Sequence, residues 1–451
     1  MWKVRQYERR GVGTSAGASQ RVAPAFFPIV CACALAALAG CTATIINTPS
    51  PPVPASTVSP IPGSPIQHIV IIMQENRTLD NLFNGFPGAD TVQSGMDGGK
   101  MVPLRPIALG DGRDPDHSHK QWWKAWDNGG MDSFEQGSVS PRELPYSYVP
   151  ESDVEAYWTM AREYTLGDRM FQSNSGPSFA AHQYMIAGQS ADVAENPSGA
   201  WGCGSSSSSA ALVGPSGTDL PGVTPCFDYQ TIADLLDKKG VTWRYYAPGE
   251  GNSFFILSAF QAVRHIRYGP DWKQDVISPQ NKVLLDIAHG ELAQVTWIVP
   301  DWGHSDHPGS GSSEGPDWVA SIVNAIGESP YWNSTAIFIS WDDWGGWYDH
   351  VNPPKMDAMG MGFRVPLLVV SPYAKHGYVS HRFHEASGFI SFMEKNFDLG
   401  TLGARDAGSD AYSDCFDYTQ TPAPYRKIKT RLTPDDLLKE KPSGPLDDDD
   451  Y

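Results

Sequence analysis

Short apolar runs rich in β-branched residues recur along this chain and alternate with segments of helical periodicity. Four of them predict buried strands, at residues 66–73, 294–300, 335–341 and 365–371. Strands that are apolar at nearly every position belong to a sheet whose two faces are both covered by helices. The pattern therefore predicts an α/β fold with a central, mostly parallel sheet and helices on both faces. In such folds the site lies beyond the carboxyl ends of the strands.

Three helices are predicted between and after these strands. Residues 231–239 carry an apolar face and stop at Gly240, a residue type that ends helices. A second helix is expected to start with Asp317 as its cap and to run to Gly327. A third is expected over residues 385–396.

Two of the predicted strands run directly into pairs of polar residues. Glu75 and Asn76 follow the first strand, and Asp342 and Asp343 follow the third. Three carboxylates and an amide oxygen are hard ligands that suit one divalent cation, and Ca²⁺, Mn²⁺, Mg²⁺ and Zn²⁺ all remain open. Without a cation the clustered carboxylates would repel one another and their pKa values would rise. Taken alone, either pair could equally cap turns or helix starts.

A third segment supplies a candidate nucleophile. Residues 174–184 contain a Gly-Pro turn and then a helical run that begins at Ser178. The N-terminus of a helix favours a bound phosphate, and a nearby metal would activate the hydroxyl. The competing reading is that Ser178 only caps its helix, which is the commoner role for a lone serine in this position.

Histidines form a fourth group of candidates, at His117, His304, His307 and His350. A neutral imidazole can bind a metal, whereas a charged one can contact phosphate oxygens or protonate a leaving group. Any single one of them is more often an ordinary surface or core residue.

Together these segments resemble the motifs of the bacterial phosphoesterase family. Residues 74–80 (QENRTLD) resemble its ENRSFD motif, and residues 342–354 (DDWGGWYDHVNPP) resemble its DE-x-GG-x-YDH-x-x-PP block. Further similarities lie at residues 116–134, 307–308, 364–366 and 371–372, so the resemblance spans about residues 66–425.

The family includes non-specific phospholipases C and acid phosphatases within the alkaline phosphatase superfamily, so the resemblance implies an alkaline-phosphatase-like fold. It also implies site roles for eight residues. The metal ligands would be Glu75, Asn76, Asp342 and Asp343, the nucleophile Ser178, and the residues around the phosphate His117, His307 and His350.

One departure from the family pattern lies beside the nucleophile. The family commonly has GPT-x-PNR where this chain has residues 176–182, GPSFAAH. Serine in place of threonine keeps the hydroxyl. The loss of the Asn, at Ala181, and of the Arg, at His182, is expected to alter phosphate contacts or substrate choice without removing a predicted metal ligand.

The predicted activity is metal-assisted hydrolysis of a phosphate ester through a phosphoserine intermediate. Large phospholipases C of this family carry additional C-terminal β domains, and here the catalytic motifs are followed by a short stretch. This favours a phosphatase acting on phosphomonoesters, with phospholipase C cleavage of phospholipid head groups as the alternative. A different class, an inactive metal-binding surface lipoprotein, predicts a lost ligand or nucleophile, and every expected position is retained.

The N-terminal region predicts export and anchoring. Residues 1–41 carry basic residues, an apolar stretch and then Leu-Ala-Gly-Cys, which looks like a bacterial lipobox with Cys41 as the lipidated residue. An ordinary signal peptide with an incidental cysteine is the alternative. Residues 42–65 include a Pro/Ser/Thr-rich run typical of an extended tether. The prediction is an exported lipoprotein of the bacterial cell envelope, periplasmic or on the outer surface, bound to a membrane through Cys41.

The rest of the chain is predicted to be one catalytic domain, residues 66–433, followed by a loosely held acidic tail, residues 434–451. The net charge of −18 excludes nucleic-acid binding through a broad basic face. In an exported protein, Cys203 and Cys226 are expected to form a disulfide around a Gly/Ser-rich insertion, which leaves Cys415 free and buried.

Overall fold

The computed structural model describes residues 60–137, 139–198, 202–204, 209–214, 219–249, 256–354 and 357–441. The predicted signal and lipobox segment, residues 1–41, and most of the predicted tether lie outside these residues.

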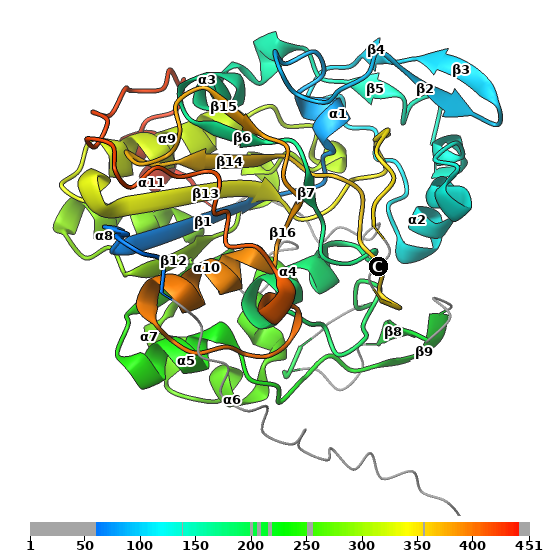
Figure 1. The fold of residues 1–451 in the computed structure, drawn as a ribbon. Coiled ribbons are helices and arrows are strands. Elements are labelled where there is room, and N and C mark those ends of the chain that lie inside the picture. The colour runs from blue at the N-terminus through cyan, green and yellow to red at the C-terminus, as the bar shows by residue number, and fades with distance from the viewer. Residues whose placement is uncertain are drawn as a thin grey trace, which may run out of the picture. The chain divides into compact units, whose positions relative to one another are not determined.

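An eight-stranded sheet forms the centre of the domain, in the order β11-β10-β12-β1-β13-β14-β6-β15 (Figure 1). Its strands are β1 (His68–Gln74), β6 (Thr165–Gly167), β10 (Trp243–Tyr246), β11 (Val276–Ile277), β12 (Val295–Ile298), β13 (Thr335–Trp341), β14 (Leu367–Val370) and β15 (Tyr378–Ser380). Strand β14 runs antiparallel to both of its neighbours, and the other pairings in this sheet are parallel. The predicted mostly parallel sheet is confirmed, and the four predicted strands are β1, β12, β13 and β14.

Helices cover both faces of this sheet. The helices are α1 (Leu79–Leu82), α2 (His119–Trp126), α3 (Glu155–Glu163), α4 (Ser178–Ala187), α5 (Ile232–Lys239), α6 (Arg264–Arg267), α7 (Asp271–Gln274), α8 (Val283–His289), α9 (Gly315–Gly327), α10 (Gly388–Phe397) and α11 (Pro434–Lys439). Helix α3 packs against α9, while α4 packs against α5 and α10, and Figure 1 shows the two groups on opposite sides of the sheet. Every residue of β13 is buried, which requires cover on both faces because successive side chains of a strand point to opposite sides.

Two predicted helix starts are wrong. Helix α9 begins at Gly315 after Glu314, and Asp317 lies in its first turn, where it accepts hydrogen bonds from Arg431 at 2.8 and 2.6 Å. Helix α10 begins at Gly388, because Glu385 is still extended and pairs with Phe171 in a short parallel ladder.

Within the described residues, four two-stranded ladders lie outside the central sheet. They are β2 (Ser94–Asp97) with β3 (Lys100–Pro103), β4 (Arg105–Pro106) with β5 (Ser147–Tyr148), β7 (Met170–Phe171) with β16 (His384–Glu385), and β8 (Ala210–Val213) with β9 (Asp219–Val223). A second hydrophobic core, which includes Trp122, Phe134, Tyr146, Trp344 and Phe363, joins the excursion after β1 to the segment after β13. This core holds the loops next to His117 and Asp343 against each other.

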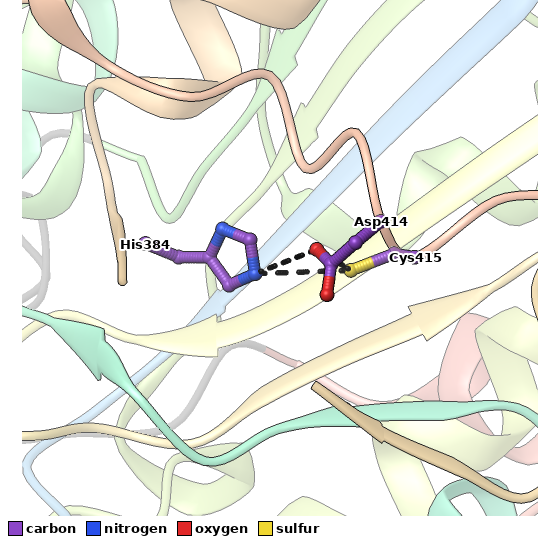
Figure 2. Close-up of side chains that lie close together, drawn as sticks. All are labelled: His384, Asp414 and Cys415. Carbon is purple, nitrogen blue, oxygen red and sulfur yellow. Dashed lines mark hydrogen bonds and ion pairs between the residues drawn. The ribbon is translucent and has the colours of Figure 1, made fainter. Parts of the chain in front are cut away.

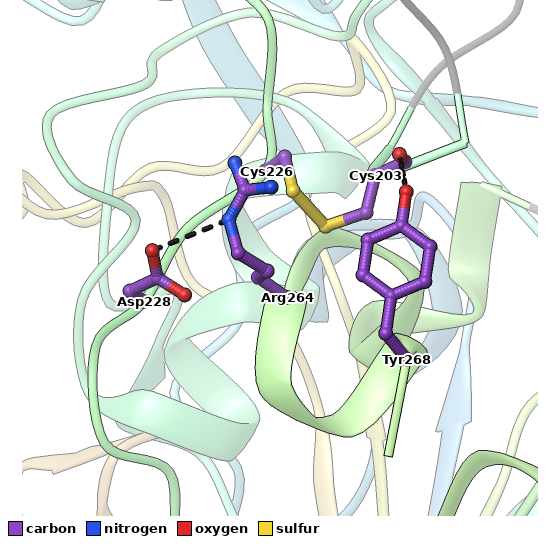
Figure 3. The surroundings of a disulfide bond; sticks show 5 residues. All are labelled: Cys203, Cys226, Asp228, Arg264 and Tyr268. Atoms are coloured by element: carbon purple, nitrogen blue, oxygen red, sulfur yellow. Dashed lines mark hydrogen bonds and ion pairs between the residues drawn. A yellow bond between two sulfur atoms is a disulfide. The ribbon is translucent and has the colours of Figure 1, made fainter.

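The cysteines pair as predicted. Cys203 and Cys226 form a disulfide with a Cα–Cα distance of 4.6 Å (Figure 3), and Cys415 is free and buried. Beside the disulfide, the hydroxyl of Tyr268 donates to the carbonyl of Cys203.

The two ends of the described chain pack on the domain. Ser64 Oγ donates to Asn396 Oδ1 at 2.7 Å, so the last residues of the predicted tether already contact the end of α10. The prediction of a loose tail is wrong for its first residues, because Thr433 and Asp436 form a capping box that starts α11, and Leu437 is buried. Among the described residues, no helix combines the length and the apolarity needed to cross a bilayer.

Candidate active site

The predicted ligand pairs leave the sheet side by side. Strands β1 and β13 are parallel neighbours, and Gln74 pairs with Trp341 at their carboxyl ends. Glu75-Asn76 and Asp342-Asp343 therefore emerge from the same edge, and the backbone N–H of Asn76 donates to Asp342 Oδ1 at 3.0 Å. Gly345 makes this approach possible, because a Cβ there would lie 2.0 Å from the carbonyl oxygen of Asn76.

Ser178 joins the two pairs from the start of α4. Its Oγ lies 3.3 Å from Glu75 Oε2 and 3.2 Å from Asp343 Oδ2. It makes no capping bond to its own helix, where Asn196 Oδ1 instead accepts from the backbone N–H of Phe179 at 2.9 Å. The structure thus turns the hydroxyl toward the carboxylates, and the reading of Ser178 as a helix cap is wrong.

The oxygens of this cluster fit a divalent cation. Asn76 Nδ2 donates to Asp343 Oδ1 at 3.2 Å, while Asn76 Oδ1 and Asp342 Oδ2 accept no hydrogen bond among the described residues. Burial, and then the charge of Asp342, raise the pKa of Asp343 to about 8. Buried acceptors without donors and carboxylates in mutual repulsion are the features that a bound cation relieves.

His182 also belongs to this cluster, although the sequence motifs did not predict it to be a metal ligand. Its Nε2 lies 3.3 Å from Glu75 Oε1 and 3.8 Å from Asp342 Oδ2. The ring is fully buried, and this burial lowers the pKa of His182 to about 4, which keeps it neutral. The available signal was its position four residues after Ser178 on a helix, since such residues share a face.

His117 and His307 lie next to the cluster, with ring centroids 5.5 Å apart. His117 Nδ1 lies 2.9 Å from the carbonyl oxygen of Pro115, and its Nε2 lies 2.9 Å from Asn76 Nδ2. The first contact places a proton on Nδ1, so Nε2 accepts from the amide. In His307, Nδ1 accepts from the backbone N–H of Gly309 at 3.1 Å, so the proton of the neutral ring is on Nε2. His117 therefore orients Asn76, whereas His307 has an Nε2–H group that can donate a hydrogen bond.

His350, which was predicted to lie around the phosphate, contacts two aspartates instead. Its Nδ1 lies 2.6 Å from Asp80 Oδ2 and its Nε2 lies 3.2 Å from Asp90 Oδ1. Arg364 Nε donates to Asp349 Oδ1 at 2.8 Å, so a guanidinium supplies the positive charge of this neighbouring group. None of the contacts found for His350 in the described residues reaches Ser178 or its carboxylates, and the structure does not bring His350 together with them.

A further buried cluster contains His384, Asp414 and Cys415 (Figure 2). His384 Nε2 lies 3.4 Å from Asp414 Oδ1, and its Nδ1 lies 3.3 Å from Asp410 Oδ2. Although burial opposes the charge, the hydrogen bonds to Asp410 and Asp414 raise the pKa of His384 to about 11. The charged ring lies between the carboxylates of Asp410 and Asp414, and this buried ion pair ties β16 to the C-terminal segment.

Fold and cluster together define an α/β enzyme with an acidic centre of the kind that binds a divalent cation. The chain belongs to the phosphoesterase family, whose model matches residues 66–400. The family predicted from the motifs is thus confirmed, and the chain is a hydrolase that acts on phosphoric ester bonds.

Similar proteins include several phospholipases C. Phospholipase C A of Mycobacterium tuberculosis is 26% identical over 410 residues, which cover 75% of this chain and 74% of that protein. The hemolytic phospholipase C of Pseudomonas aeruginosa is 24% identical over 404 residues, which cover 74% of this chain and 53% of that protein. Among solved structures, a protein in the alkaline phosphatase superfamily from Vibrio parahaemolyticus is 12% identical with a TM-score of 0.38, over 76% of this chain and 70% of that one.

Proposed function

We propose that this protein hydrolyses phosphate esters with Ser178 as its nucleophile, assisted by one divalent cation held by Glu75, Asn76, Asp342 and Asp343. The observation that carries the proposal is the position of Ser178 Oγ, within 3.3 Å of Glu75 and 3.2 Å of Asp343. A hydroxyl at the start of a ten-residue helix, directed at carboxylates, is suited to attack a phosphate that the helix N-terminus also attracts.

In the first step Ser178 Oγ attacks phosphorus, its proton passes to Asp343 Oδ2, which lies 3.2 Å away, and the bond from phosphorus to the leaving oxygen breaks. His307 Nε2–H donates a hydrogen bond to the leaving oxygen, and the departing alcohol takes its proton from a water molecule, which becomes hydroxide. In the second step this hydroxide attacks the phosphoserine, the bond from phosphorus to Ser178 Oγ breaks, phosphate is released, and Asp343 returns its proton to the serine. A bound divalent cation supplies positive charge that lowers the pKa of the hydroxyl and neutralises the phosphate oxygens.

Replacement of Ser178 tests this reaction. We expect Ser178→Ala to lower kcat on p-nitrophenyl phosphate by about 10³-fold or more, because the nucleophile is lost. Ser152→Ala, at an exposed serine, is the matched control and keeps the rate. Acid quenching of the wild type with substrate, followed by mass spectrometry of the peptide that contains Ser178, should reveal a phosphoserine. A Ser178→Ala rate near that of the wild type would contradict the assignment.

Two substrate classes follow from the sequence and the relatives. A phosphomonoester remains the substrate predicted from the sequence. Cleavage of phospholipid head groups is the second candidate, and the relatives named phospholipase C favour it.

Parallel assays separate the two substrates. The wild type is assayed on p-nitrophenyl phosphate and on phosphatidylcholine vesicles, with Ser178→Ala as the background for both. A monoesterase turns over the soluble ester at the higher kcat/KM, and a phospholipase C releases phosphocholine from the vesicles.

The position of the enzyme in the cell is part of the proposal. Lipidation of Cys41 and the tether of residues 42–65 would hold the catalytic domain at a membrane of the cell envelope. The sequence of the first 41 residues supports this arrangement. The inactive surface lipoprotein remains the alternative from another class, but no predicted ligand is missing to favour it.

A further inference from the structure

His182 occupies a position from which it can contribute a nitrogen to the cation site. It lies on α4 one helical turn after Ser178, with 0% of its surface exposed. Single atoms of Glu75, His182 and Asp342 all lie within 4.8 Å of one another.

The spacing of these atoms suits a shared ion. His182 Nε2 is 3.3 Å from Glu75 Oε1 and 3.8 Å from Asp342 Oδ2. Nitrogen and oxygen ligands at roughly 2.0–2.2 Å from one Zn²⁺ lie about 3.0–3.6 Å apart. Asp342 Oδ2 accepts no hydrogen bond among the described residues, although Asp342 is only 3% exposed, so its lone pairs are available on this side.

The contact of His182 Nδ1 determines which ring nitrogen carries the proton. His182 Nδ1 lies 3.5 Å from the hydroxyl oxygen of Tyr245, and that hydroxyl donates its own proton to the carbonyl of Leu257. The tyrosine oxygen can therefore only accept from Nδ1–H. A proton on Nδ1 leaves the lone pair of Nε2 directed at Glu75 and Asp342, which is how second partners of metal-bound histidines act.

We propose that His182 is a nitrogen ligand of the catalytic cation and that it makes this site prefer Zn²⁺ over Ca²⁺. The inference rests on the proposed cation site and deepens it. Imidazole nitrogen is a good ligand for Zn²⁺, whereas Ca²⁺ is held by oxygen. The related pattern commonly has an arginine at this position, which would bring a fixed positive charge. With histidine there, the charge that balances Glu75 and Asp342 must come from the ion.

The alternative role is a hydrogen bond from Nε2–H to Glu75, which would only hold that carboxylate in place. His182→Gln distinguishes the two, because the glutamine amide can still donate to Glu75 but offers oxygen instead of nitrogen to an ion. His265→Asn is the control, since His265 is exposed on α6 and pairs with Asp234 at 2.9 Å.

The test measures binding on the full-length protein after chelation, with no assay of turnover. Zn²⁺ and Ca²⁺ affinities are determined by titration for wild type, His182→Gln and His265→Asn. We expect His182→Gln to lower the affinity for Zn²⁺ at least about 10-fold. The affinity for Ca²⁺ should stay within about threefold of the wild-type value, a difference of about 0.6 kcal/mol in binding free energy. X-ray absorption at the zinc edge should lose imidazole scattering in His182→Gln and retain it in His265→Asn.

Equal weakening of both ions, or unchanged imidazole scattering, would overturn the role of His182 as a ligand. Failure of the wild type to bind either ion would overturn the cation site of the proposed function itself, which is a distinct outcome. Circular dichroism checks the fold of His182→Gln. His182→Asn serves as the second variant if His182→Gln is unstable, with the same expected loss of Zn²⁺ preference.

Discussion

The side-chain amide nitrogen of Asn76 lies 2.9 Å from Nε2 of His117, whose Nδ1 is held in turn by the carbonyl of Pro115. The chain Pro115–His117–Asn76 fixes the orientation of the Asn76 amide, whose Nδ2 also donates to Asp343 Oδ1 at 3.2 Å. We expect His117→Ala to lower metal affinity or kcat by about 10- to 100-fold, as loss of an orienting partner does. Metal titration and steady-state kinetics measure this, with His265→Ala as the control. Wild-type values for both would contradict the positioning role.

His307 should matter most when the leaving oxygen carries the most negative charge. The hydrogen bond from Gly309 to Nδ1 places the proton of the neutral ring on Nε2, so Nε2–H can donate a hydrogen bond to that oxygen. We expect His307→Ala to slow hydrolysis of an alkyl phosphate by about 10²-fold or more. The loss on p-nitrophenyl phosphate should be smaller, since p-nitrophenolate spreads its charge over the ring. Equal losses on the two esters would assign His307 to phosphate binding instead of contact with the leaving oxygen.

Glu394 makes stability depend on pH. Burial, and then the charge of Asp406, raise the pKa of Glu394 from its ordinary 4.5 to about 9. Between these values the folded protein keeps a proton that the unfolded chain has lost, so stability falls as pH rises, by up to about 1.4 kcal/mol per pH unit. Glu394→Gln should flatten this dependence and gain relative stability toward pH 8. Urea unfolding from pH 5 to pH 8 measures it, with exposed Glu155→Gln as the control. Parallel curves for wild type and Glu394→Gln would refute the assignment.

Anchoring depends on one cysteine. In cells we expect Cys41→Ala to move the protein from the membrane fraction to the soluble envelope fraction or to leave it uncleaved, because lipid attachment requires the thiol. Labelling with a fatty-acid analogue checks the same step. Cys415→Ala is the matched control, since Cys415 is buried within the domain. Incorporation of label into Cys41→Ala would exclude this cysteine as the lipid site.

The sequence predicted those parts of the fold that depend on local pattern. Strands β1 and β13 are apolar at most positions. Because they are parallel neighbours, the polar residues that follow them meet, which brings Glu75-Asn76 to Asp342-Asp343. The Gly176-Pro177 turn predicted that Ser178 lies at the start of a helix, and α4 begins there. The Cys203–Cys226 bridge followed from the insertion that these two residues enclose.

Other features depend on contacts that no local pattern shows. His182 was predicted only as a departure from the family motif, although its Nε2 lies 3.3 Å from Oε1 of Glu75, the residue directly after β1. His350 directly follows Asp349 in the motif, yet its two ring nitrogens contact Asp80 and Asp90, which come from distant segments of the chain. The start of α10 was missed because Glu385 pairs with a strand more than two hundred positions earlier in the chain.

Strand β1 has a consequence for how the protein comes to be folded. It is the first strand of the described chain, but its ladder partners are β12 and β13, so that Ile69 pairs with Val295 on one side and Ala336 on the other. A growing chain must hold β1 without either neighbour until most of the domain has been synthesised, and non-local pairing of this kind is slow. The order of the strands thus makes closure of the central sheet, and with it the assembly of the acidic cluster, a late event in the synthesis of the domain.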